Sequence, residues 1–389
     1  MDAGRTPTKP LSLPEKLRDP ASYSLIIIYN FRRLYKFMLY LINNCVMRRK
    51  LLYIITACLL VSSLRAQTGG DNVYEFLNLT QSGLVSSLGG TNVSLNSFGL
   101  NLAYHNPALL NNSMDKYLAL NYVNYFAGIN YGLAIYSRSV QGVGNFAAGM
   151  TYLNYGSFTE ADPSGAITGT FGASEYALSL IFSKEIDSLF SAGINFKPVL
   201  SHLEKYTSFG FAFDLGAAYH SKSNLFSAGI ALKNIGLEVT TYAGEARQKL
   251  PFEIQAGVSQ KLAHAPFRFS LTIRHLEKYD LTYEYSDTTA ENNYLQSSEF
   301  LENIMRHAIA GVEFIPHKNF YLSAGYNYQR RKELQVESRS SMVGFSWGFG
   351  INTSWLNIEF GRATYHLAGA SNNVSLIVRP DLLYNRFRK

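Results

Sequence analysis

Residues 209–220 read Phe-Gly-Phe-Ala-Phe-Asp-Leu-Gly-Ala-Ala-Tyr-His, so that large apolar side chains alternate with small or polar ones. A similar alternation runs through residues 189–197 and 226–233, on either side of this stretch. Successive side chains of a β-strand point to opposite faces, so a period of two predicts a strand. Leu189–Asn234 is therefore expected to form three consecutive β-strands.

The two faces of these strands differ in composition. One face carries Phe, Ile, Leu and Tyr, whereas the other carries Gly, Ala, Ser and Asn with few charges. A transmembrane barrel turns its apolar face to lipid and keeps a polar interior. A soluble β-sandwich or lipocalin-like barrel is the alternative, but its outer face usually carries Lys, Glu and Thr. The composition favours the membrane barrel.

The chain has the pattern of a secretory signal ahead of these strands. Met47-Arg48-Arg49-Lys50 is a positive start, Leu51–Val61 is apolar, and Ala66 is a small residue at the expected cleavage site. We therefore expect a signal peptide over residues 47–66 and interpret residues 1–46 as an upstream extension from a start codon assigned too early. A signal anchor over Ser24–Ile42 is the alternative for that extension, although several polar and basic residues interrupt it.

The excess of basic residues and both cysteines lie in this predicted leader. Of 35 basic and 28 acidic residues in the chain, eleven and three lie in residues 1–66, which leaves 24 and 25 and a net charge of −1. The basic character is therefore no argument for nucleic-acid binding, and no nucleic-acid partner is expected. Cys45 and Cys58 also lie in the leader, so disulfides and Cys-bound metals are excluded from the mature chain. Ile55–Cys58 resembles a lipoprotein processing box, which leaves lipidation as an alternative.

Period-two segments continue to the carboxyl end, and no later stretch is apolar enough for a spanning helix. Insertion into a membrane would therefore require a closed barrel, and each segment of about ten residues is long enough to cross at a tilt. The predicted fold is all-β, a transmembrane antiparallel barrel of about 14 strands over residues 117–389. The predicted strands are Tyr117–Tyr125, Gly128–Arg138, Val143–Tyr155, Ser174–Lys184, Ser188–Leu200, Tyr206–His220, Asn224–Asn234, Leu250–Lys261, Pro266–His275, Arg306–Ile315, Asn319–Arg330, Ser340–Asn352, Ser354–Tyr365 and Ser371–Pro380.

Connection lengths support the same interpretation. The links after even-numbered strands are short, whereas most links after odd-numbered strands are longer, including Gly156–Ala173 and Leu276–Met305. Outer-membrane barrels have short periplasmic turns and long extracellular loops. The first link, Phe126–Ala127, is short and breaks the rule.

Residues 67–116 are too irregular for barrel wall, and they are expected to form an N-terminal plug or a periplasmic segment. Gly89-Gly90 precedes Asn106-Pro107-Ala108, and both elements come before the first strand. This order resembles the amino-terminal region of the FadL-like outer-membrane barrels, in which a glycine-rich stretch and an Asn-Pro-Ala element belong to a segment that plugs the lumen. The resemblance makes Gly89, Gly90, Asn106, Pro107 and Ala108 the candidate plug motif.

No catalytic site is expected in this sequence. It has no phosphate-binding Gly-Lys-Ser/Thr loop and no Lys-Thr-Gly. Its eight histidines form no spaced metal cluster, so we expect no catalytic, metal or cofactor site. Candidate partner residues lie in two predicted outer loops: Arg330, Arg331 and Lys332 in one, and Asp280, Tyr283, Tyr285 and Asp287 in the other.

Six further stretches follow one another along nearly the whole mature chain: Gly69–Leu79, Asn121–Phe126, Leu250–Gln255, Leu262–Arg268, Phe320–Arg331 and Tyr365–Gly369. They are similar to the PorQ-like barrels of the type IX secretion system. This resemblance implies a non-enzymatic outer-membrane protein that anchors a cell-surface attachment complex, in which cargo is processed and attached. It implies as partners outer-membrane lipid and a PorZ-like surface protein, with PorU-like and PorV-like members of the complex. A FadL-like transporter of small hydrophobic molecules is the alternative.

Overall fold

The computed structural model describes residues 72–97, 99–242, 246–281, 296–334, 342–366 and 369–387. All of them belong to one compact unit, Ala66–Lys389. The expected upstream extension and signal peptide lie outside the described residues. Within the described ranges, no helix combines the length and the apolar character needed to cross a bilayer.

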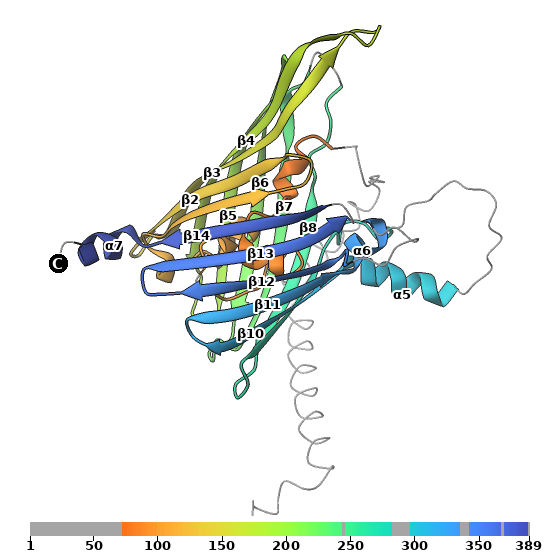
Figure 1. Cartoon of the computed structure of the whole chain (residues 1–389). Coiled ribbons are helices and arrows are strands. Elements are labelled where there is room, and N and C mark those ends of the chain that lie inside the picture. Colours follow the sequence, from red (N-terminus) through yellow and green to blue (C-terminus); the bar gives the residue numbers. More distant parts are fainter. Residues whose placement is uncertain are drawn as a thin grey trace, which may run out of the picture. The chain divides into compact units, whose positions relative to one another are not determined.

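Fourteen antiparallel strands in the described ranges close into a single barrel, in which each strand pairs with its neighbours in sequence and β1 pairs with β14 (Figure 1). The predicted all-β fold and strand number are thus confirmed. The strands are β1 (Leu118–Asn124), β2 (Asn130–Val140), β3 (Gly144–Ala161), β4 (Ile167–Glu185), β5 (Phe190–Leu203), β6 (Tyr206–His220), β7 (Phe226–Thr240), β8 (Glu253–Lys261), β9 (Phe267–Ile273), β10 (Ala308–His317), β11 (Phe320–Asn327), β12 (Phe345–Asn352), β13 (Leu356–His366) and β14 (Gly369–Val378).

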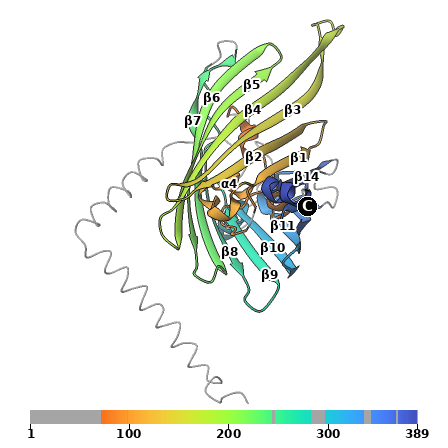
Figure 2. The same ribbon diagram turned by 90° about the vertical axis from the view of Figure 1, so that its left-hand side faces the viewer.

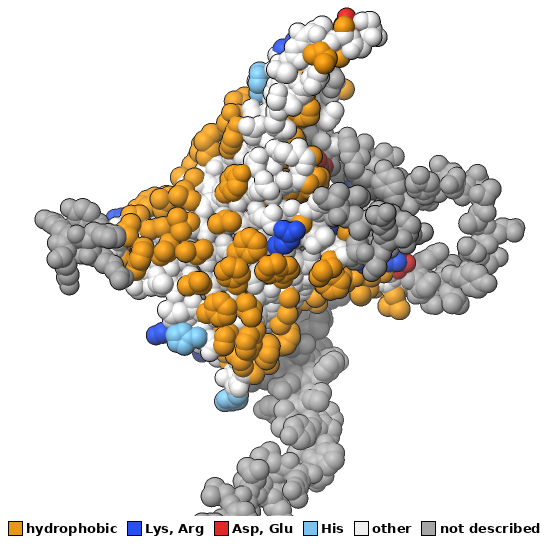
Figure 3. Space-filling view, in the orientation of Figure 1, with side chains coloured by type: hydrophobic (Ala, Val, Ile, Leu, Met, Phe, Trp, Pro, Cys, Tyr) orange, Lys and Arg blue, Asp and Glu red, His pale blue; other side chains and the backbone are white. Residues whose placement is uncertain are grey.

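The apolar face of the strands is the outer surface of the barrel. In β5 and β6 the side chains of Phe190, Ile194 and Leu215 are exposed, while those of Asn195 and Asp214 are fully buried. Figure 3 shows hydrophobic side chains spread across the outer wall. A wall that exposes aromatic and aliphatic side chains suits contact with lipid, as in an outer-membrane barrel. The predicted orientation of the two faces is confirmed.

The connections after β2, β4, β6, β8, β10 and β12 contain at most five residues. We call this the periplasmic end of the barrel and the opposite end the outer end, following the loop lengths of outer-membrane barrels. Three connections at the outer end are long, namely residues 241–252, 274–307 and 328–344.

One predicted long loop, Gly156–Ala173, is wrong. β3 and β4 continue to pair through most of it, as far as Ala161 opposite Ile167, which leaves only residues 162–166 as a turn. The rings of Phe158 and Phe171 stack across the two strands with centroids 5.2 Å apart, and such aromatic pairs stabilise a hairpin. β2 accompanies β3 only as far as Asn154, so the hairpin extends beyond the barrel wall (Figures 1 and 2).

The predicted strand Asn319–Arg330 is partly wrong, because β11 ends at Asn327 and helix α6 (Tyr328–Leu334) follows it. Asn327 causes the change, since its side-chain oxygen accepts a hydrogen bond from the backbone N–H of Arg330 at 2.9 Å. This is the geometry of a helix N-cap, for which asparagine is among the preferred residues. The other two longer helices are α5 (Gln296–His307) and α7 (Pro380–Phe387).

The irregular segment before β1 lies inside the barrel, where Figure 1 shows it in orange. We call residues 72–114 the plug. Most of its side chains are buried, and they pack against inward-facing residues of the strands. Its short elements are η2 (Glu75–Asn78), α3 (Gly83–Ser87), α4 (Leu102–His105), η3 (Pro107–Leu109) and η4 (Asn112–Met114).

Candidate functional site: a plugged lumen

The plug begins at the outer end of the barrel and reaches the periplasmic end. The backbone N–H of Val73 donates to Lys249 O, in the outer connection between β7 and β8, at 2.9 Å. Further along, Asn96 O accepts a hydrogen bond from Arg268, at the periplasmic end of β9, at 3.0 Å. The chain then folds back through the lumen before it enters β1. The plug therefore occupies the lumen along the length of the wall.

One row of wall glycines receives α3 and the residues that follow it. A Cβ on Gly325 of β11 would lie 2.2 Å from the carbonyl carbon of Leu88, and a Cβ on Gly361 of β13 would lie 2.1 Å from Gly83 O. Contacts this short exclude any larger side chain at either position. The Gly-rich inner face thus lets the plug backbone approach the wall closely.

The candidate plug motif lies in two separate places. Gly89 and Gly90 end α3 with φ of 102° and 100°, a conformation that favours glycine, and they lie near Ile309 and Arg330. Asn106-Pro107-Ala108 packs instead against β5, β6 and β7, where a Cβ on Gly193, Gly216 or Gly229 would meet the plug at 2.0–2.4 Å. The two halves of the motif are therefore both in the lumen, but they contact different parts of the wall.

The side chain of Asn106 makes hydrogen bonds within the plug and also with the barrel wall. Its side-chain oxygen accepts from the backbone N–H of Ala108 at 3.0 Å, which caps η3. Its amide nitrogen donates to Val93 O at 2.7 Å and to Ala217 O at 3.3 Å. One side chain thus joins two passes of the plug to strand β6.

Buried charged side chains lie on the inner face of the strands, next to the plug. Lys197 Nζ lies 2.6 Å from Asp214 Oδ1 and 2.5 Å from Asn234 Oδ1, and both charged side chains are almost completely buried. Lys233 lies over the ring of Tyr104 in the plug, with Nζ 5.3 Å from the ring centroid. A buried ion pair is stable only when hydrogen bonds and opposite charges surround both of its groups. Here the strands contribute Asp214 and Asn234, and the plug contributes the ring of Tyr104.

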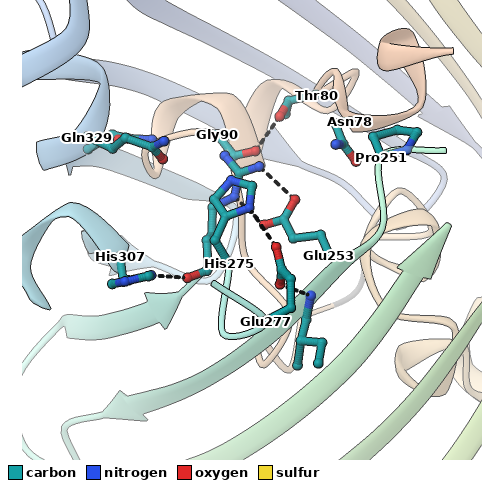
Figure 4. Close-up of polar contacts among 12 residues, drawn as sticks. Asn78, Thr80, Gly90, Pro251, Glu253, His275, Glu277, His307 and Gln329 are labelled. Carbon is teal, nitrogen blue, oxygen red and sulfur yellow. Dashed lines mark hydrogen bonds and ion pairs between the residues drawn. The ribbon is translucent and has the colours of Figure 1, made fainter. Parts of the chain in front are cut away.

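Two bidentate arginine–glutamate pairs lie further along the inner wall. Arg274 pairs with Glu253 through contacts of 2.6 and 2.8 Å, and Arg268 pairs with Glu313 through contacts of 2.7 and 2.6 Å. Near the first pair, at the outer end, His275 lies 3.1 Å from Glu277, and Thr80 of the plug bonds to Gly90 (Figure 4). Paired, planar contacts of this kind fix both side chains in position.

Glu359 of β13 binds the amino-terminal turn of α3. One of its carboxylate oxygens accepts from the backbone N–H of Leu84 at 3.3 Å and from the hydroxyl of Ser82 at 3.4 Å. The sequence indicated an inner face of small or polar residues with few charges, whereas the described strands carry more charged side chains on that face than expected. The signal was available, because these charged residues occupy inward positions of the period-two pattern: Lys197, Asp214, Lys233, Glu253, Arg268, Glu313 and Glu359.

The candidate partner residues have different surroundings. Arg330 is 8% exposed, its guanidinium lies 4.0 Å from the ring centroid of Tyr365, and it donates to Gly89 O at 3.3 Å. It faces the plug rather than the outer rim expected for it, because the N-cap at Asn327 turns this segment into a helix. Lys332 pairs with Glu302 of α5 at 3.2 Å.

The remaining candidates divide between described and undescribed parts of the chain. Arg331 donates to Val343 O at 3.4 Å, so it too is engaged with the protein. Asp280 is described and has an interaction partner. Tyr283, Tyr285 and Asp287 lie outside the described residues. In the described ranges, no group of three or more His, Cys, Asp or Glu residues could hold a metal ion.

An exposed apolar face at the outer end was not predicted. Phe300, Leu301, Ile304 and Met305 of α5 are all exposed by about half or more. The opposite side of the helix carries Glu302, which binds Arg306 at 3.0 Å and Lys332 at 3.2 Å and so joins α5 to α6. A helix with one face held by ion pairs and the other apolar and exposed is amphipathic. Clustered exposed apolar side chains are typical of interaction surfaces.

No known protein family matches this sequence, and no curated protein matches it. Solved structures with a similar arrangement include the toluene transporter TodX of Pseudomonas putida, with 12% identity, a TM-score of 0.46, and coverage of 77% of this chain and 97% of the other. The monoaromatic hydrocarbon channel CymD has 11% identity and a TM-score of 0.44, with coverage of 77% and 97%. A Pseudomonas aeruginosa FadL homologue also has 11% identity and a TM-score of 0.44, with coverage of 80% and 100%.

Identities this low do not carry an activity from one chain to another. The description of the fold rests on the closed strand order and the apolar outer wall of this chain. What those channels transport is a property of those channels.

Proposed function

We propose that this chain is a non-enzymatic outer-membrane anchor, which holds a surface attachment complex of the kind to which the PorQ-like barrels belong. The partner would be a PorZ-like surface protein, with PorU-like and PorV-like members in the same complex. The sequence resemblance supplies the identity of these partners. The observation that carries the anchoring role is the filled lumen.

A filled lumen is the property expected of an anchor. The plug is held by backbone contacts with wall glycines, by Asn106 and by the carboxylate of Glu359. Releasing it would break these contacts and expose to water the apolar plug side chains that are buried in the lumen, which costs free energy. An anchor needs a rigid wall and an outer docking surface, and a plug that is bonded to the strands stiffens the wall.

The apolar face of α5 is the docking surface that we assign to this anchor. It lies at the outer end, it is exposed, and its opposite side is fixed to α6 by ion pairs, so it presents a preordered apolar patch. Apolar side chains that are buried on association supply most of the binding free energy in protein interfaces. The extended β3–β4 hairpin rises at the same end and would flank a bound partner.

A detergent pull-down from outer membranes tests this proposal. The tagged wild-type barrel should retain a PorZ-like protein, identified by mass spectrometry, and the double variant Phe300→Ser, Leu301→Ser should lose it. Ile186→Ser is the matched control, because Ile186 is also a highly exposed apolar residue but lies at the periplasmic end. Deletion of residues 280–295, which keeps all of α5, tests the neighbouring part of the same connection. Isolation of the wild-type barrel without any surface partner would contradict the anchor.

Transport of a small hydrophobic molecule is the second candidate. Its specific support is a cluster of buried apolar side chains in the outer half of the lumen, which includes Tyr74, Phe76, Tyr131, Leu153 and Leu250. Apolar side chains of this kind line sites for apolar ligands, and here Tyr74 and Phe76 of the plug are packed among them, so a ligand would take their place. Native mass spectrometry of the purified barrel with toluene or a fatty acid distinguishes the two functions. A bound hydrophobe that Leu153→Asp abolishes would favour transport over anchoring.

A further inference from the structure

A row of polar side chains crosses the apolar outer wall near its outer end. Arg362 of β13 lies opposite Asn372 of β14, Asn372 lies opposite Asn124 of β1, and Asn124 lies opposite Asn130 of β2. The Arg362 guanidinium donates to Asn372 Oδ1 at 2.7 Å, and the Asn124 amide donates to Asn130 Oδ1 at 3.2 Å. We call these four residues the polar row.

The polar row belongs to the lipid-facing side of the wall. Arg362 lies opposite Trp347, whose side chain is exposed, and Asn124 follows exposed Tyr122 by two positions on β1. Figure 3 shows a basic side chain among hydrophobic ones over β13 and β14. A cation on the lipid face of a barrel is costly at the bilayer midplane but tolerated near the interface, where lipid headgroups balance its charge. A guanidinium has five N–H donors, and the Asn372 carbonyl takes one of them.

A groove of about 400 Å³ adjoins the row on the same outer wall. Its floor is formed by Gly132 and Ala134 of β2, and its sides by larger side chains of β1 and β3, such as Leu120 and Met150. Asn130 lines one part of it, so the polar row and the apolar groove are continuous. The groove is elongated along β2, because its lining residues follow one another along that strand.

We propose that the polar row and the groove bind one phosphorylated glycolipid of the outer leaflet. Arg362 would pair with a phosphate, for which the planar guanidinium is well matched. The three asparagine amides offer donors and acceptors that suit sugar hydroxyls. An acyl chain would lie in the groove, where apolar surface is buried.

The width of the row identifies the class of headgroup. Four adjacent strands about 4.8 Å apart place Arg362 and Asn130 on backbones roughly 14 Å apart. A single phosphodiester is too small to contact both ends, whereas a phosphorylated sugar headgroup spans such a distance. All four residues lie toward the outer end of their strands, which is the side of the outer leaflet.

Native mass spectrometry tests the site. The full barrel is purified in mild detergent, stripped of lipid and incubated with either diphosphorylated lipid A, its dephosphorylated form, or phosphatidylglycerol. The wild-type protein should retain diphosphorylated lipid A at least about tenfold better than either alternative, because a charge-assisted hydrogen bond from a guanidinium to a phosphate is stronger than a bond between neutral groups. Equal retention of phosphatidylglycerol would overturn the choice of a glycolipid, and equal retention of the dephosphorylated form would overturn the role of Arg362.

Two variants distinguish the binding of the lipid headgroup from the binding of the acyl chain. Arg362→Gln should lower retention by about tenfold, and Ala134→Leu should lower it by filling the groove. Ala324→Leu is the matched control, because Ala324 is an exposed outward alanine on β11, outside the row and the groove. Folding of every variant is checked by the shift of the heat-denatured band on a gel. Retention that is unchanged in both folded variants would overturn the site, and neither result depends on whether the barrel anchors a partner.

Discussion

Asn106 of the plug and Gly216 of the wall are in direct contact: a Cβ on Gly216 would lie 2.0 Å from Asn106 Oδ1. No rotation of the asparagine relieves this easily, because its oxygen caps η3 and its nitrogen bonds to Val93 O and Ala217 O. The position of the plug against β6 therefore depends on the absence of a side chain at residue 216.

Gly216→Val is expected to displace the plug and to destabilise the folded barrel by about 1–3 kcal/mol, the usual cost of forcing extra atoms into a packed interior. The measurement is urea unfolding in micelles, combined with limited proteolysis of the plug. Ala217→Val is the control, since Ala217 is the next residue on β6 and points outward. Equal stability of the two variants would show that the plug does not rest on this strand as the structure has it.

The buried pair Lys197–Asp214 leads to a second prediction. Asp214→Asn leaves the ammonium of Lys197 buried without its counter-charge, and removal of one partner of such a pair costs about 3–5 kcal/mol. Lys197→Met alone should also destabilise, whereas the double variant should recover part of the loss because no unpaired charge remains. A double-mutant cycle of unfolding free energies measures the coupling. Additive losses would argue against a functional ion pair.

The sequence predicts the barrel wall far better than its contents. All fourteen strands and the outward face of β5, β6, β7 and β12 follow from the period of two, because one face had to meet lipid. The hairpin beyond Asn154 was assigned to a loop, since its Thr, Ser and Gly residues show no apolar face. Those strands leave the wall, so no membrane contact imposes a pattern on them.

The contacts between the plug and the wall could not be predicted from the sequence. The inward glycines were interpreted as a polar lining, whereas Gly216 and Gly325 are small because the plug backbone touches them. Such a contact joins residues far apart in the chain and has no local signature. Arg330 was misplaced for a local reason, namely the N-cap at Asn327, which is visible in the sequence but competes with a continuing strand pattern.

Membrane orientation is a third prediction. The strands and the plug have no cysteine, because the two cysteines of the chain, Cys45 and Cys58, precede residue 72, so a single cysteine introduced into the barrel reports its own position. Ile167 and Ile186 are 75% and 71% exposed and lie at opposite ends of β4. In intact cells an impermeant maleimide should label Ile167→Cys and leave Ile186→Cys unlabelled, while both should react after lysis. The reverse result would invert the assigned ends.

Acid should loosen the contact between α5 and α6. Burial acts to raise the pKa of Glu302, but the hydrogen bonds and charges of Lys332 and Arg306 outweigh it and hold the pKa below the ordinary value of 4.5. A carboxyl whose pKa is lower in the folded state contributes stability above its unfolded pKa and loses that contribution as pH falls through the folded value. The contact is thus expected to persist at neutral pH and to weaken in acid, as the pH falls through the lowered pKa of Glu302.

Spin labels on Phe300→Cys of α5 and Gln329→Cys of α6 measure this change as a distance distribution that broadens with acid. Glu302→Gln is the control, because it keeps the shape of the side chain and removes the titration, so its distribution should be broad at every pH. A narrow distribution in that variant at neutral pH would mean that packing, rather than the ion pairs, positions α5.

Removal of the plug provides the final prediction. Deletion of residues 72–114 takes away the side chains that fill the lumen and leaves a wall lined by Asp214, Lys233 and Glu359 among others. A fourteen-stranded wall with a polar, charged lining admits water and ions once it is empty. Planar-bilayer recordings should therefore show steady conductance for the deletion variant and very little for the wild type.

Gly325→Val, which pushes Leu88 and Gly89 away from β11, should give brief openings of intermediate size, because the plug stays attached but loses one wall contact. Steady conductance of the intact chain would mean that the plug leaves the lumen readily, and would favour transport over anchoring.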